Sequence, residues 1–119
     1  MKLDVNVLVN KDNPLDLNYI PDNLYIVDDN KDNFHNYKDP NLKLMLRKDI
    51  KKYIDMLLMD AKKLGFPLIV DSGYRSSSYQ QVILEKLIEE KGMEAYKLVA
   101  LPGMSEHQTG LAVDFAYYK

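Results

Sequence analysis

The sequence predicts a single domain of mixed α and β structure, and three observations lead to this prediction. Its 119 residues are enough chain for one domain. Apolar residues recur at three- and four-residue steps between residues 50 and 64, which is the period of an amphipathic helix. Short apolar or alternating runs, typical of strands, lie before and after that segment. Helices and strands therefore interleave along the chain.

Composition excludes several classes of protein. The 16 Lys and Arg nearly balance the 18 Asp and Glu, so no basic excess is available to neutralise a nucleic-acid backbone. Without cysteine there are no disulfides, no thiol catalysis, no thiolate zinc site and no iron–sulfur cluster. No apolar run approaches the roughly 20 residues of a membrane span, and the first residues lack the apolar segment of a signal peptide. A hydrophobic content of 46% supports a packed core.

The first part of the chain differs in composition from the rest. All nine Asn lie at or before Asn41, and Asn-Asp-Pro combinations there favour turns and coil. Within it, the apolar runs 5–9 and 24–27 are candidate strands. We expect residues 1–41 to form an arm that wraps a helix–strand core built from residues 42–119.

The remaining elements follow in order. From Leu44 on the pattern is helical, and the predicted helix at 50–64 stops at Gly65. A short strand is predicted at 67–71. A second helix should begin among Ser76, Ser77 and Ser78, because Ser77 with Gln80, or Ser78 with Gln81, has the spacing of a capping box. This helix should run to about Lys91, and residues 93–99 are predicted to add a helical turn or two. Residues 111–115 alternate as a strand.

Two residues near the end of the chain are candidate metal ligands. Alternation along 111–115 places Leu111, Val113 and Phe115 on a core face and Asp114 on the opposite face. A turn after His107 could fold its ring back toward Asp114. Imidazole and carboxylate together suit zinc, although an ordinary hydrogen-bonded His–Asp pair would have the same spacing.

Residues 105–114 also carry a family resemblance. They match S-x-H-x-x-G-x-A-x-D at every fixed position, which resembles the signature of the LAS zinc peptidases, the group named for lysostaphin, D-alanyl-D-alanine carboxypeptidases and sonic hedgehog. Residues 102–114 are similar to the VanY-type carboxypeptidase version, and 72–76 followed by Gln80 is a second match. Residues 8–15 are a weaker third match. The resemblance implies an α+β, hedgehog-like zinc peptidase fold with helices packed on a small antiparallel sheet.

The resemblance also implies roles for individual residues. His107 and Asp114 would bind Zn²⁺, Arg75 would stabilise developing charge, and Ser105 and Gln80 would help to bind the terminal carboxylate of the substrate. The chain has 14 Lys but two Arg, which suggests independently that the planar guanidinium of Arg75 is required. Arg75 could instead be a structural fork bonded to carbonyls, and Gln80 could be half of a capping box.

One part of the family pattern is missing. Members continue past the Asp strand to a Glu-Pro-Trp-His type motif, which supplies the general base and a third zinc ligand. This sequence has no Trp and ends five residues after Asp114. Residues 32–35 imitate the motif and include the other histidine, His35, but they lie in the arm and we interpret them as coincidence. We therefore expect a C-terminally truncated domain, inactive or incomplete by itself, with an open strand edge that allows self-association.

The expected function is that of a zinc-dependent D-alanyl-D-alanine carboxypeptidase acting on peptidoglycan stem peptides at an extracytoplasmic, cell-envelope location. Neither nucleic acid nor a membrane span is expected as a partner. One alternative is a pseudo-peptidase that binds wall peptides or zinc without hydrolysis. A second is a peptidoglycan endopeptidase, which would need an open groove in place of a carboxylate pocket.

Overall fold

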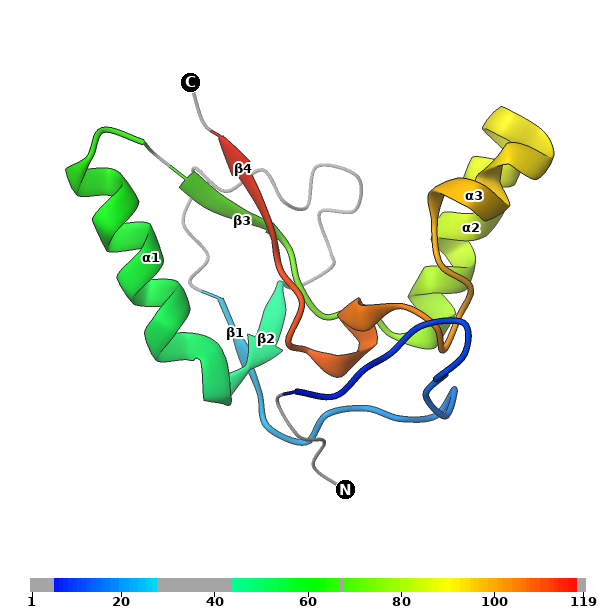
Figure 1. Ribbon diagram of the computed structural model, residues 1–119, viewed down its shortest axis with the longest axis horizontal. Coiled ribbons are helices and arrows are strands. Elements are labelled where there is room, and N and C mark those ends of the chain that lie inside the picture. Colours follow the sequence, from blue (N-terminus) through cyan, green and yellow to red (C-terminus); the bar gives the residue numbers. More distant parts are fainter. Residues whose placement is uncertain (1–5, 28–43, 67, 118–119) are drawn as a thin grey trace.

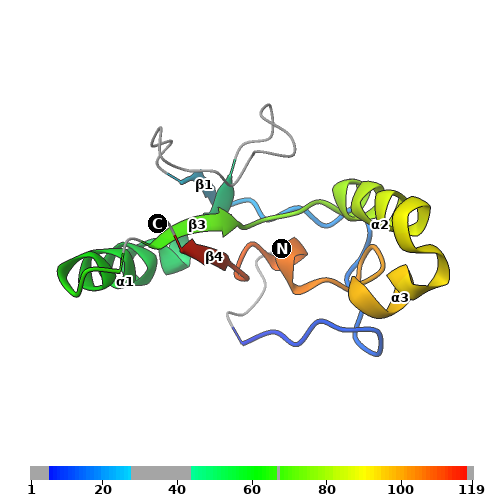
Figure 2. The same cartoon turned by 90° about the horizontal axis from the view of Figure 1, so that it is seen from above.

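The computed structural model describes residues 6–27, 44–66 and 68–117. Two antiparallel strand pairs lie in the middle of the fold, with one long helix at each end (Figure 1). Seen from above, the strand pairs and both helices spread along the longest axis (Figure 2). This arrangement confirms the predicted α+β class.

The first strand pair joins the predicted arm to the predicted core. β1 (Leu24–Ile26) pairs with β2 (Met45–Arg47), with Leu24 opposite Arg47. The candidate strand at 24–27 is thus confirmed, whereas the helical pattern expected from Leu44 on is wrong at its start. Leu44 and Leu46 are 6% and 0% exposed and alternate with the half-buried Met45, which is the period of a strand.

The first long helix follows a 3₁₀ turn, η1 (Lys48–Ile50). α1 (Lys51–Lys63) lies within the predicted span, and the chain leaves it through Gly65 at φ +83°. Ile54 and Ala61 are buried, but Tyr53, Leu57 and Leu64 of the predicted apolar stripe are 67%, 44% and 74% exposed. Part of the stripe thus packs inward, where α1 contacts β3, and the rest is exposed.

The second strand pair carries the site. β3 (Leu68–Ser72) pairs with β4 (Asp114–Tyr117), and Val70 lies opposite Phe115. Phe115 and Val113 pack against the core cluster, which consists of Val27, Leu44, Leu46, Ile54 and Val70. The strand predicted at 111–115 is wrong in its first half: pairing begins at Asp114, because β3 ends at Ser72 and offers no partner to residues 111–113.

The second long helix has a different cap from the one expected. α2 (Ser77–Lys91) begins after Ser76, whose side chain accepts a hydrogen bond from the Tyr79 backbone N–H. Neither predicted capping box forms, and the Gln80 side chain donates to the carbonyl of Ala100 instead. The predicted helical turns that follow are η2 (Gly92–Glu94) and α3 (Ala95–Leu98).

The N-terminal segment lies against the site-bearing loops. Residues 6–9 form no strand, so the described part of the candidate strand 5–9 is wrong. The segment bonds through the Leu15 N–H to the Gly103 carbonyl and through the Leu17 carbonyl to the Ser77 hydroxyl. The division into an arm (1–41) and a core (42–119) remains a prediction, and β1 pairs across it.

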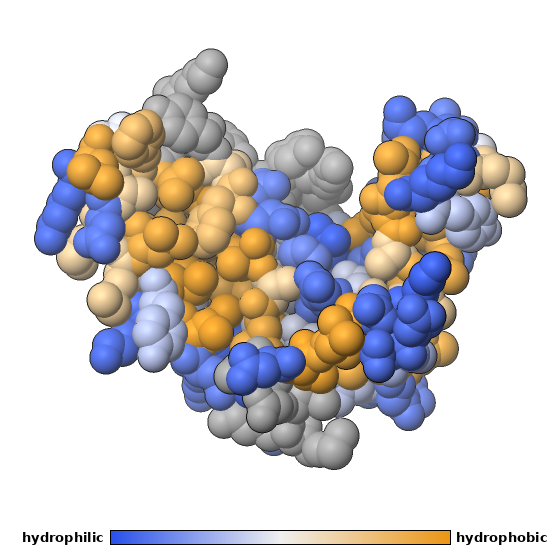
Figure 3. All heavy atoms as spheres, viewed as in Figure 1, coloured by the Kyte–Doolittle hydropathy of each residue, from blue (hydrophilic) through white to orange (hydrophobic). Residues whose placement is uncertain are grey.

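Exposed apolar residues occur in several parts of the surface. In Figure 3 apolar side chains gather over the region of α1 and the β3–β4 pair, and Met56, Met59 and Phe66 are each more than half exposed. In the described part of the chain, no helix has the length and apolarity needed to cross a membrane.

Candidate metal centre

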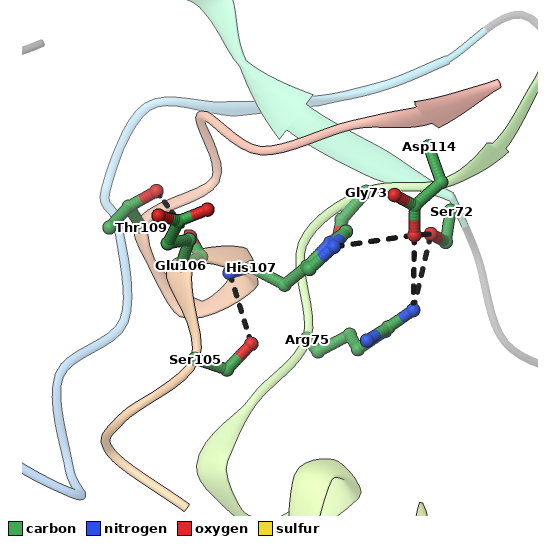
Figure 4. A network of polar contacts seen from close by, with 8 residues as sticks. All are labelled: Ser72, Gly73, Arg75, Ser105, Glu106, His107, Thr109 and Asp114. Atoms are coloured by element: carbon green, nitrogen blue, oxygen red, sulfur yellow. Dashed lines mark hydrogen bonds and ion pairs between the residues drawn. The ribbon is translucent and has the colours of Figure 1, made fainter. Parts of the chain in front are cut away.

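The candidate site forms where three segments meet. The end of β3 and the turn after it supply Ser72, Gly73 and Arg75, the 3₁₀ helix η3 (Glu106–Thr109) supplies His107, and β4 supplies Asp114. Figure 4 shows the His107 ring and the Arg75 guanidinium pointing toward the Asp114 carboxylate from two directions. Residues more than 30 positions apart in sequence therefore share one site.

Local hydrogen bonds hold η3 in place. The Ser105 side chain caps it by accepting from the His107 backbone N–H at 3.2 Å. Gly110 ends it in the left-handed region at φ +76°, and its carbonyl accepts from the Arg47 N–H at 2.8 Å. A Cβ at Gly110 would lie 3.0 Å from Arg47 and Leu24 side-chain atoms, so this turn requires glycine for both conformation and space.

The His107 ring is fixed through one of its nitrogens. Nδ1 lies 2.7 Å from the carbonyl oxygen of Gly73, and the side chain is 14% exposed. Because a carbonyl can only accept, Nδ1 must carry the proton in this contact. Burial, followed by the nearby positive charge of Arg75, lowers the pKa of His107 below 6.5, so the ring is neutral at pH 7 and Nε2 presents a lone pair.

The second nitrogen faces the carboxylate. Nε2 of His107 lies 3.3 Å from Oδ2 of Asp114, which confirms the predicted convergence of the two residues. A lone pair and a carboxylate oxygen facing each other repel unless a cation lies between them. Two zinc ligands at bond lengths of about 2.0–2.2 Å in tetrahedral geometry lie roughly 3.3–3.6 Å apart, so the pair fits zinc.

Arg75 shares the same carboxylate. Its Nη2 lies 3.5 Å from Oδ2 of Asp114 and 3.2 Å from the hydroxyl of Ser72, which in turn lies 2.5 Å from that same Oδ2. The Arg75 side chain is 22% exposed, so part of its guanidinium is open to solvent. Arg75 and His107 therefore lie beside the same carboxylate, and the role implied for Arg75 remains a prediction.

Ser105 and Gln80, the other two residues with expected roles, are buried. Ser105 is 7% exposed and its hydroxyl oxygen caps η3. Gln80 is 2% exposed, donates to the Ala100 carbonyl at 2.8 Å, and has a side-chain oxygen without a hydrogen-bond partner among the described residues. A buried amide oxygen without a hydrogen-bond partner costs free energy, and this oxygen is available to accept a hydrogen bond from a donor.

No third ligand joins the pair within residues 6–27, 44–66 and 68–117, where no cluster of three His, Cys, Asp or Glu side chains could hold a metal. His35 and the rest of the 32–35 imitation lie outside the described residues. The described part of the site therefore holds two candidate ligands, His107 and Asp114, and one cationic neighbour, Arg75.

Two residues at the site were not identified from the sequence. Gly73 positions the His107 ring, and Ser72 bonds to Asp114. Both lie in the 72–76 match, but no role was expected for either of them. The pairing register of β3 with β4 places Ser72 beside Asp114. This register depends on contacts between residues more than 40 positions apart, so local sequence patterns do not reveal it.

Comparisons with known proteins show which family the chain resembles. The family model described as VanY, D-alanyl-D-alanine carboxypeptidase, matches residues 43–119. The Bacillus subtilis protein YodJ is 38% identical over 114 residues, which are 95% of this chain and 40% of YodJ. The structure of the LdcB LD-carboxypeptidase has 38% identity and a TM-score of 0.75, over 95% of this chain and 51% of that one.

A VanY D,D-pentapeptidase variant from a VanB-type resistance cassette, in complex with Zn(II), is similar at 30% identity and a TM-score of 0.72. The match covers 93% of this chain and 60% of the VanY chain. The chain thus spans about half the length of these relatives.

Proposed function

The chain belongs to the VanY family of D-alanyl-D-alanine carboxypeptidases, and we propose that it carries part of the site of a zinc-dependent carboxypeptidase that acts on peptidoglycan stem peptides. One observation carries the proposal: Nε2 of the part-buried His107 lies 3.3 Å from a carboxylate oxygen of Asp114, while Nδ1 of the same ring contacts the Gly73 carbonyl. This arrangement is suited to a divalent cation, and the family and the zinc complex of a relative favour zinc.

In this proposal His107 and Asp114 hold the metal. The Gly73 carbonyl keeps His107 in the tautomer that leaves Nε2 free, as partners of metal-binding histidines commonly do. Zinc, when bound, supplies a Lewis acid that polarises the scissile carbonyl and acidifies a water molecule.

The other proposed roles belong to substrate recognition and charge. Arg75 would bind or stabilise an oxygen that gains negative charge, because its guanidinium is partly exposed beside Asp114. Ser105 and Gln80 would help to bind the terminal carboxylate of the peptide. The side-chain oxygen of Gln80 cannot bond to an ionised carboxylate. The side-chain nitrogen, which donates one N–H to the Ala100 carbonyl, would therefore have to supply its second N–H.

A catalytic zinc normally has three protein ligands, and proton transfer needs a base. Two candidate ligands lie among the described residues, so we propose that the third ligand and the general base come from chain outside those residues or from a second chain. In the described residues β4 pairs with β3 alone, and its other edge is a candidate surface for a further strand or for self-association. The proposed location is extracytoplasmic, where peptidoglycan is found.

Two measurements test the proposal. Isothermal titration with Zn²⁺ should give one site that is lost in His107→Ala and unchanged in Ser78→Ala, which replaces an exposed side chain at the start of α2. Release of D-Ala from a muramyl pentapeptide distinguishes the alternatives. Zinc and peptide binding without D-Ala release would favour the pseudo-peptidase, cleavage of a cross-bridge without D-Ala release would favour the endopeptidase, and absence of zinc binding would contradict the metal site.

A further inference from the structure

A hydroxyl lies between the two charged groups of the site. Ser72 Oγ is 2.5 Å from Oδ2 of Asp114 and 3.2 Å from Nη2 of Arg75 (Figure 4). We infer that Ser72 is a positioning residue, which turns the Asp114 carboxylate toward the metal and is brought there by an irregularity in β3. This inference rests on the metal site proposed above.

The irregularity changes which residue faces Asp114. Val70 pairs with Phe115, so a regular antiparallel ladder would place Asp71 opposite Asp114. The register shifts between Val70 and Ser72, and Ser72 is the residue opposite Asp114. Two carboxylates directly opposite each other would repel, whereas a hydroxyl can donate to a carboxylate. Bulges of this kind commonly redirect a side chain next to an active site.

The direction of the Ser72 hydroxyl is determined by its neighbours. A guanidinium can only donate, so in its contact with Arg75 the Ser72 oxygen accepts. The single hydroxyl proton is then free to point at the Asp114 carboxylate, which can only accept when ionised. Ser72 therefore transmits the orientation of Arg75 to Asp114.

Asp114 needs such a partner. Its side chain is 54% exposed and it begins β4, so packing alone does not restrict its rotation. The Arg75 contact, at 3.5 Å, is long, and Nε2 of His107 carries a lone pair and cannot donate to the carboxylate. The Ser72 bond is the shortest of the three contacts to Oδ2. We therefore assign the orientation of Oδ2 toward His107 mainly to Ser72.

A matched pair of substitutions isolates the hydroxyl. Ser72→Thr keeps it and Ser72→Val has the same branched shape without it, and both side chains are compatible with a strand. In zinc titrations of the whole chain, Ser72→Val should bind about 10-fold to 100-fold more weakly than Ser72→Thr, which is the usual loss when a partner of a metal ligand is removed. Ser78→Ala is the control, and thermal unfolding establishes that every variant is folded. Equal zinc affinity of the Thr and Val variants would overturn the inference.

A second measurement needs no metal. In crystal structures of the metal-free variants, the distance from Asp114 Oδ2 to His107 Nε2 should stay near 3.3 Å in Ser72→Thr and lengthen in Ser72→Val. An unchanged distance in Ser72→Val would overturn the positioning role even if the wild-type chain binds zinc. If the wild-type chain binds no zinc, the proposed function fails, while the crystallographic comparison still decides the role of Ser72.

Discussion

Replacing Gly73 by alanine should destabilise the fold and release the His107 ring together. Gly73 does not have a positive φ, so its backbone conformation is open to any residue. A side chain is excluded at this position because there is no space for it. An added Cβ would lie 2.4 Å from the backbone oxygen of Met45 and 2.9 Å from a methyl carbon of Leu46. Leu46 is completely buried and a strand carbonyl cannot rotate away, so the turn itself must move.

The magnitude follows from what that movement breaks. The contact with Met45 O must open by about 0.6 Å to reach the 3.0 Å that real Cβ contacts keep. The same oxygen accepts from the Tyr74 N–H at 2.7 Å, so this hydrogen bond lengthens as well. Overpacking costs about 1–3 kcal/mol and a lost hydrogen bond about 0.5–1.5 kcal/mol. We expect a loss of about 2–4 kcal/mol, a large part of the 5–15 kcal/mol that is typical of a domain.

The assay combines urea unfolding with nitrogen NMR of the His107 ring. In Gly73→Ala the displaced carbonyl should no longer hold Nδ1–H, and zinc affinity should fall with it. Gly65→Ala is the matched control, because Gly65 has φ +83° and no atom within 4 Å of an added Cβ. That variant should lose roughly 1–2 kcal/mol through backbone strain and keep the ring tautomer. A Gly73→Ala protein with wild-type unfolding free energy and an unchanged tautomer would show that the turn has room for a Cβ at this position.

Three further outcomes are expected. In the metal-free chain the His107 ring, followed by NMR, should titrate below pH 6.5. Because the unfolded state then binds more protons than the folded state, the free energy of unfolding should fall as the pH is lowered from 6.5 through the folded-state pKa. A ring that titrates above pH 6.5 would contradict this. Arg75→Lys should reduce D-Ala release at least tenfold in any active preparation, since an ammonium cannot reproduce the planar fork, and near-normal release would refute the role of Arg75. The chain should bind zinc weakly and release D-Ala slowly, because its described residues hold two candidate ligands where a catalytic zinc normally has three; tight 1:1 zinc with rapid turnover would contradict this.

Sequence patterns that span a few residues were sufficient to predict the helices and to single out the candidate ligands. The apolar period at 50–64 predicted α1 because the helix repeat is local. The motif at 105–114 identified His107 and Asp114, and alternation placed Val113 and Phe115 on the core face. These inferences succeed because each depends on neighbours in sequence.

Features that depend on contacts between distant parts of the chain could be known only from the folded structure. Met45–Arg47 is a strand because β1 lies beside it, although its apolar residues also fit the helical pattern that follows. Gln80 bonds to the Ala100 carbonyl, not to a helix cap, because α2 and the loop at residue 100 come together in space. Ser72 faces Asp114 through a register shift between strands 42 residues apart in the chain. A shift of one residue moves a side chain to the other face of a strand, and the register that prevents it is set by the whole sheet.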